Sequence, residues 1–119
     1  MDINAAECAL ARHVARQSGL ALDQTVLCGN GGVVESPPMV RVRFVSGKLA
    51  ATALAEFVAE VHGVFAEPEE AHAFAAAVWG KLPRYGDDGF TELAADDDVK
   101  FEEQEGAFTA TGRIKACFA

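Results

Sequence analysis

The stretch from Glu56 to Leu82 constrains the fold most, because its hydrophobic period changes at Pro68. Before Pro68, apolar and small side chains occupy every second position, the period of a strand with one buried face: Phe57, Ala59, Val61, Gly63 and Phe65. After Pro68, apolar side chains recur with helical spacing: Ala71, Phe74, Ala75, Val78 and Leu82. The stretch therefore predicts a long strand that leads into a helix packed on its apolar face.

The first half of this stretch also fits a second interpretation. Its apolar residues fall on one stripe of a helix, and alanine-rich segments favour helices: Leu54, Phe57, Val58, Val61 and Phe65. Gly63 and the β-branched valines disfavour a helix here. We favour a strand from Phe57 to Phe65.

The N-terminal half predicts one helix and two further strands. Residues 2–18 place Ile3, Ala6, Leu10 and Val14 on one stripe, with Glu7 among the residues expected to face water and Gly19 as the terminator. A short strand is expected over residues 25–28, followed by a turn at 29–32. Residues 39–45 alternate as a strand, and a tight turn at 46–48 joins them to a strand that begins between Ala51 and Ala55.

The C-terminal part predicts a long polar connection and a final hairpin. Residues 84–98 are rich in Gly and Asp, which favours a connection without regular structure. A hairpin is expected over residues 99–118, with its turn at Glu105 and Gly106. The expected fold is a single α+β domain over residues 1–119. Its mainly antiparallel sheet of four to five strands packs with two helices, in the order α-β-β-β-α-β-β.

Charge and cysteine content restrict the partners and the compartment. The formal net charge is −8, and residues 61–119 carry 12 acidic against 5 basic side chains. This balance disfavours binding to nucleic acid phosphates, which needs a basic face. No apolar run approaches the roughly 18 residues of a membrane span, and the start lacks the basic region of a signal peptide. Cys8, Cys28 and Cys117 have no paired spacing, which favours reduced cysteines in a cytosolic protein.

No catalytic, cofactor or metal constellation is visible in the sequence. The glycines after Cys28 lack the Lys-Ser/Thr of a phosphate-binding loop, and His13, His62 and His72 lack the spacing of a zinc site. The acidic run at residues 96–98 lacks the alternating order of a calcium loop. Cys28 lies in an apolar strand, where cysteines are usually inert. We therefore expect no enzymatic activity, no cofactor and no metal.

The order of these features resembles a known family. The segments that carry the resemblance are TVLCG, PPMVRVRFVSG, EFVAEVHGVFAEP, EEAHAFAAAVWGKL and GAFTATGRIKACFA, which together span nearly the whole chain. They resemble the tail terminator, or tail completion, proteins of long-tailed bacteriophages and related prophages. The alternatives are another head–tail joining or minor tail protein, and a small cytosolic α+β binding module without catalysis.

The resemblance implies a structural protein rather than an enzyme. Such proteins form a ring, commonly hexameric, that caps the tail tube and meets the head–tail connector. The partners would be further copies of the chain, the tail tube protein and the connector, without sequence-specific nucleic acid binding and without a membrane. The chain would lie in the host cytoplasm during assembly and then in the virion tail.

Two groups of residues are candidates for this role. The first group would form subunit contacts on the outward face of the sheet: Arg41, Arg43, Glu56, Val58, Glu60 and Val64. An ordinary exposed sheet face explains this group equally well. The second group, Asp96, Asp97 and Asp98, would face the lumen of the ring and repel passing DNA.

Overall fold

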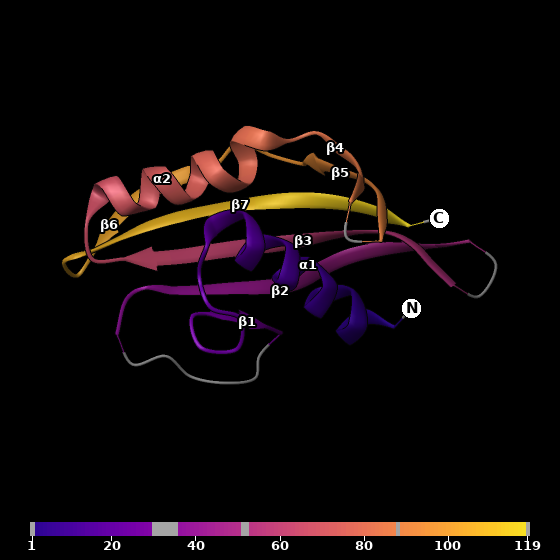
Figure 1. The fold of residues 1–119 in the computed structure, drawn as a ribbon, viewed down its shortest axis with the longest axis horizontal. Coiled ribbons are helices and arrows are strands. Elements are labelled where there is room, and N and C mark those ends of the chain that lie inside the picture. Colours follow the sequence, from indigo (N-terminus) through magenta and orange to yellow (C-terminus); the bar gives the residue numbers. More distant parts are fainter. Residues whose placement is uncertain (1, 30–35, 51–52, 88, 119) are drawn as a thin grey trace.

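A computed structural model describes residues 2–29, 36–50, 53–87 and 89–118 (Figure 1). The elements run in the order α1 (Ile3–Ser18), β1 (Val26–Cys28), β2 (Met39–Ala50), β3 (Ala53–Phe65), α2 (Pro68–Val78), the 3₁₀ turn η1 (Trp79–Lys81), β4 (Arg84–Asp87), β5 (Phe90–Ala95), β6 (Lys100–Gln104) and β7 (Ala107–Phe118).

The seven strands form one mixed sheet in which β7 takes part in three pairings. The strand order is β1-β2-β3-β7-β5-β4, and β6 also pairs with β7. On one edge of β7, β6 pairs with the first half of the strand and β5 with the second half. On the other edge, β3 pairs with β7 along nearly the whole length of β7. Among the described strands, only β1 and β2 run parallel, and the other pairs are antiparallel.

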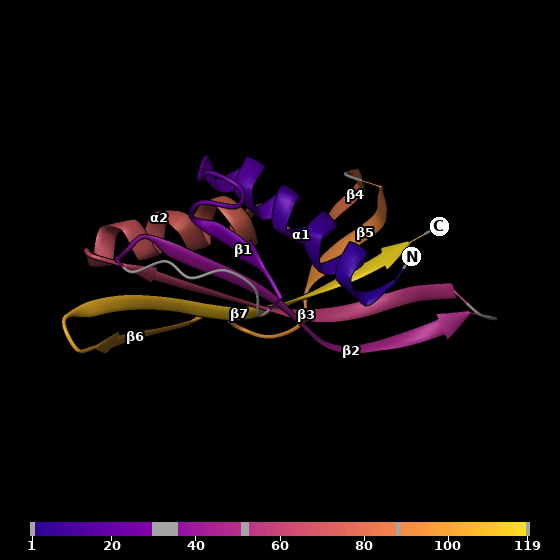
Figure 2. The same cartoon turned by 90° about the horizontal axis from the view of Figure 1, so that it is seen from below.

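Both helices cover the same face of the sheet. Figure 2 shows α1 and α2 on one side of the strands, with no helix on the other side in the part of the chain that is drawn in colour. The inward side chains of the sheet and helices form one core: Leu10, Val14, Val40, Val42, Phe57, Val61, Phe74, Val78 and Ile114. Burial of these side chains removes apolar area from water, which is the main driving force for folding.

Local signals in the sequence place most elements correctly. The Asp2 carboxylate accepts a hydrogen bond from the Ala5 N–H at 2.7 Å and caps α1, which ends at Gly19 with a φ of 76°. Residues 57–65 form part of a strand, as we favoured, and β3 begins at Ala53, inside the expected window. The turn before β7 lies at Glu105 and Gly106.

The structure contains one hairpin and one strand extension that the sequence does not predict. β4 and β5 pair antiparallel within residues 84–95, where we predicted a connection without regular structure. β5 is stabilised by pairing with β7, which is distant in sequence, and local sequence patterns carry no information about such pairing. The expected turn at 46–48 is also wrong, because β2 continues to Ala50 through an irregularity after Phe44. The fold is α+β with two helices, but the sheet has more strands than four to five, and it is mixed.

α2 lies close to β7 because Gly112 leaves room for an aromatic ring. A Cβ atom placed on Gly112 would lie 2.9 Å from the Trp79 side chain. Trp79 is buried at the end of α2 and contacts Phe74 edge to face, with ring centroids 5.9 Å apart. The absence of a side chain at Gly112 therefore sets how closely the helix approaches the sheet.

Candidate interaction surface

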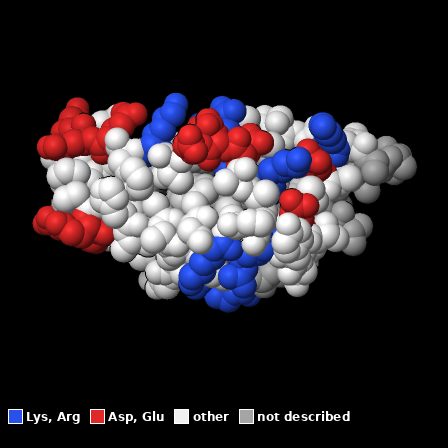
Figure 3. Space-filling view, turned by 90° about the horizontal axis from the view of Figure 1, so that it is seen from above, with Lys and Arg blue, Asp and Glu red and all other residues white. Residues whose placement is uncertain are grey.

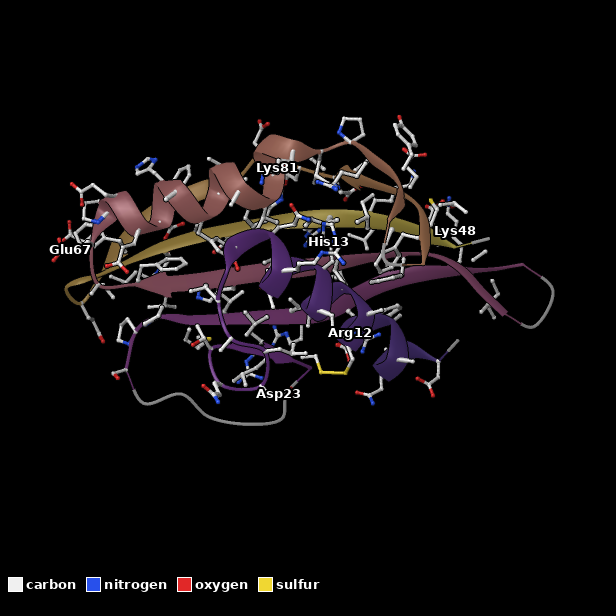
Figure 4. All side chains as sticks on the ribbon, viewed as in Figure 1. Arg12, His13, Asp23, Lys48, Glu67 and Lys81 are labelled. Atoms are coloured by element: carbon white, nitrogen blue, oxygen red, sulfur yellow. A yellow bond between two sulfur atoms is a disulfide. The ribbon has the colours of Figure 1, made fainter. Side chains whose placement is uncertain are left out.

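A disulfide closes the edge of the sheet at β1. Cys8 of α1 and Cys28 of β1 are bonded, with Cα atoms 5.3 Å apart (Figure 4). The prediction of reduced cysteines is therefore wrong for these two residues. The pairing arises because α1 packs on β1, a contact that the separation of 20 residues in sequence did not reveal.

A buried carboxylate continues this closure along β2. Glu7 is 9% exposed, although we expected it to face water. One oxygen of its side chain accepts a hydrogen bond from the Phe44 N–H at 2.8 Å, just beyond the last residue of β2 that pairs with β1. Arg41 donates to the Gly29 carbonyl at 2.7 Å on the same edge. Ile3, by contrast, was expected in the core and is 50% exposed.

The face of the sheet opposite the helices carries the first group of candidate residues. Val58, Glu60 and Val64 of β3 are half-buried there. Arg43 lies opposite Glu60, and Glu60 lies opposite Arg113 of β7. Opposite charges in register on adjacent strands help to fix the strand alignment.

Two other candidates, Arg41 and Glu56, lie opposite a histidine and a lysine. Arg41 lies opposite His62 rather than an acidic residue, and His62 shares a 2.7 Å hydrogen bond with Thr111. Glu56 lies opposite Lys48 and is 3.9 Å from its ammonium group and 3.7 Å from that of Lys115. The sheet face opposite the helices, which we call the open face, therefore already carries polar contacts between strands of the same chain.

Cys117 lies beside Glu56 on this open face. Its Sγ atom is 3.9 Å from a carboxylate oxygen of Glu56. Burial, and then the negative charges of Glu56 and Glu92, raise the pKa of the Cys117 thiol above its ordinary value. The thiol is therefore a poor nucleophile at neutral pH.

The acidic run lies beside basic residues rather than alone. Asp96, Asp97 and Asp98 are exposed in the turn between β5 and β6. Asp97 and Asp98 border a shallow hollow of about 220 Å³ with Glu60, Lys100 and Arg113. A second hollow, of about 120 Å³, is lined by Met39, Arg41, Arg43, Glu60 and His62. The structure brings the acidic run near the open face but does not join it to Val58 or Val64.

One end of the molecule is acidic, and we refer to it as the acidic end. Figure 3 shows carboxylates gathered at the end where α2 begins and β6 lies in Figure 1. Its exposed acidic residues come from these two segments and their flanks: Glu67, Glu69, Glu70, Glu102, Glu103 and Glu105. Between them lies a hollow of about 200 Å³, whose lining includes Pro68, His72, Phe101 and Phe108.

The acidic end combines charge, aromatic surface and a free strand edge. Phe101 is 43% exposed and stacks on His72, with ring centroids 4.3 Å apart. All five side chains of β6 are exposed, and no described strand other than β7 pairs with it. Such an edge is able to accept a further strand.

The hairpin of β2 and β3 projects at the opposite end, and we call residues 45–49 of β2 the arm. Every side chain of the arm is exposed, with Val45 at 42% and Leu49 at 69%. Lys48, labelled at that end in Figure 4, has a side chain that is 81% exposed. The sequence analysis does not identify the arm, because it predicts a turn at residues 46–48, where β2 continues as a strand.

Neither a metal site nor a membrane helix is found in the described ranges. No group of three or more His, Cys, Asp or Glu side chains there is arranged to hold a metal ion. None of the described helices has the length and apolar character needed to cross a bilayer. Comparison with protein-family models and with curated proteins gives no match.

Proposed function

We propose that the chain is a tail terminator-like structural protein of a bacteriophage or prophage. Copies of the chain assemble into a ring that caps the tail tube and joins it to the head connector. The observation that carries this proposal is the one-sided architecture, in which helices cover one face of the sheet and leave the other face and two strand edges accessible. A heterologous contact between such surfaces forms a ring when its rotation closes.

Several features of the open face support a docking role. Val58 and Val64 are half-buried on the sheet face that the described helices leave uncovered, and Arg43, Glu60 and Arg113 form a charged row beside them. Charges around apolar side chains set the orientation of a partner more than the affinity for it. The disulfide also fits a virion component, since disulfides persist on virion surfaces.

The acidic run has a role in this proposal. Asp96, Asp97 and Asp98 face the lumen and keep DNA from adhering to the wall. Replacing all three with Asn should slow DNA ejection or lower infectivity, whereas unchanged infectivity would remove this role.

Electron microscopy tests the proposal as a whole. The purified chain is added to growing tail tubes assembled from the tube protein of the same genome, and tube length is measured with and without it. We expect a ring-shaped density at one end of each tube and an arrest of growth. Tubes that lengthen unchanged, without density at either end, would refute the proposal.

A further inference from the structure

We propose that the arm of one copy binds the acidic end of the next copy, adding a strand to the free edge of β6. The inference deepens the proposed function, because it names the contact that would build the ring. Its occupant is a second copy of this chain, and the surfaces involved are residues 45–49 on one side and β6 with the start of α2 on the other.

The two surfaces lie at opposite ends of an elongated molecule. The chain measures 46 Å along its longest axis, against 27 and 21 Å along the others. Figure 4 places Lys48 of the arm and Glu67 of the acidic end toward opposite ends of that axis. A contact between them is therefore head to tail, which builds a ring or an open filament rather than a closed dimer.

The backbones of the two surfaces match in length and in free hydrogen-bonding groups. β6 has five residues and pairs on one edge only, with β7, among the described strands. The arm also has five residues, of which residues 46–49 pair with β3 on one edge, while β1 stops at the level of Val42. Each surface thus presents a strand edge that main-chain hydrogen bonds to a second strand would satisfy.

The side chains of the two surfaces are complementary in charge. Lys48 projects from the arm, and its 3.9 Å contact with Glu56 is exposed and therefore weak. The acidic end offers Glu102 and Glu103 on β6 itself, with Glu67, Glu69 and Glu70 at the start of α2. When Lys48 binds the acidic end of another copy, its ammonium group is attracted by these carboxylates and gives up only the weak contact with Glu56 in its own chain.

The apolar side chains are also complementary. Leu49 is the most exposed large aliphatic side chain of the described residues, and it lies next to Lys48. The hollow at the acidic end, about 200 Å³ in volume and bordered by Phe101 and Phe108, has room for a side chain of this size. Removing Leu49 and Phe101 from water together makes them the central anchors of the contact.

Sedimentation velocity at low salt tests the contact with matched variants of the full chain. We expect Leu49→Asp to weaken self-association at least about a hundredfold, because it places a carboxylate in an apolar, acidic site. The control Tyr85→Asp, at a side chain that is equally exposed on β4, should leave association unchanged. Circular dichroism melts verify that each variant is folded.

Charge reversal provides a second test that leaves the fold intact. Lys48→Glu should weaken association about tenfold, and Glu103→Lys in the same chain should restore most of the loss. Lys81→Glu, an exposed cation on η1, serves as the control. Added salt should weaken the association of the unaltered chain and have less effect on Lys48→Glu.

Disulfide cross-linking detects the contact even if association is too weak for sedimentation. In a Cys117→Ser background, the pair Leu49→Cys and Phe101→Cys should give a ladder of covalent oligomers under mild oxidation, whereas Tyr85→Cys with Phe101→Cys should not. A chain that stays monomeric and gives no ladder, or association that survives Leu49→Asp, would overturn the inference.

The tube experiment separates this inference from the proposed function. Association through the arm without capping of tubes would keep the contact and refute the phage role. Capping that persists in Leu49→Asp would keep the phage role and refute the contact.

Discussion

The two edges of this sheet, at β1 and β2 and at β6, differ in how their backbone groups are covered. At β1 and at β2 as far as Phe44, the Cys8–Cys28 disulfide, the Glu7 carboxylate and the Arg41 guanidinium close the edge, and the arm lies beyond this closed part. At β6, five exposed side chains and an excess of carboxylates are the only protection among the described residues. Exposed charge on an edge strand discourages indiscriminate pairing.

The difference indicates which edge is structural and which is available. The closed edge anchors α1 to the sheet and thereby holds one side of the core in place. The open edge contributes little to the core, so that a partner can bind it without disturbing the fold. The edge that stabilises the fold is therefore separate from the edge proposed to bind a partner, and the following measurements test that separation.

The largest expected effect comes from removing the disulfide. Replacing Cys8 and Cys28 with Ser should lower the free energy of unfolding by about 3 kcal/mol, because the cross-link restricts the unfolded chain. Urea denaturation of the variant and of the unaltered chain measures this loss. Cys117→Ser is the control, and an equal loss there would contradict the special role of the closed edge.

Glu7 should give the next largest effect. Glu7→Ala leaves the partly buried N–H of Phe44 without its acceptor and should cost about 2 kcal/mol. Glu7→Gln keeps an oxygen that can accept this hydrogen bond, so that about half of the loss should be recovered. Urea denaturation distinguishes the two, and Glu103→Ala at the open edge should change stability by less than about 0.5 kcal/mol. A stability loss at Glu103 equal to that at Glu7 would show that both edges are structural.

Hydrogen exchange compares the two edges within one molecule. The amides of β6 should exchange at least about a hundredfold faster than those of residues 40–44, because β6 can separate locally while the core stays folded. Mass spectrometry of peptides from both segments measures the rates under native conditions. Equal protection of the two segments would mean that β6 opens only with the whole domain.

The smallest effect concerns the reactivity of the three cysteines. Without reductant, only Cys117 should react with iodoacetamide, since Cys8 and Cys28 are bonded to each other. The raised pKa keeps Cys117 protonated to higher pH than an ordinary thiol, so that its alkylation at about pH 8 is slow. Glu56→Gln removes one cause of the shift and should speed the reaction, whereas Glu102→Gln should not. Alkylation of Cys8 without reductant would contradict the closed edge.

Part of the candidate surface could be predicted from the sequence and part could not. Alternation in residues 57–65 and 108–118 identified the outward face with Val58, Glu60 and Val64, because neighbouring side chains of a strand point to opposite faces. The arm and the acidic end were not identified as surfaces. Their significance depends on which strand edges lack a partner, and pairing involves residues far apart in the chain.

The sequence by itself determined the type and the buried face of most elements. The period change at Pro68, the cap at Asp2 and the alternation of β7 act over a few residues, where backbone geometry and burial decide the outcome. Only the tertiary structure decided the β4–β5 hairpin, the burial of Glu7, the disulfide and the order of the strands. Each of these depends on contacts between segments that meet only when the chain has folded, and local propensity carries no information about such contacts.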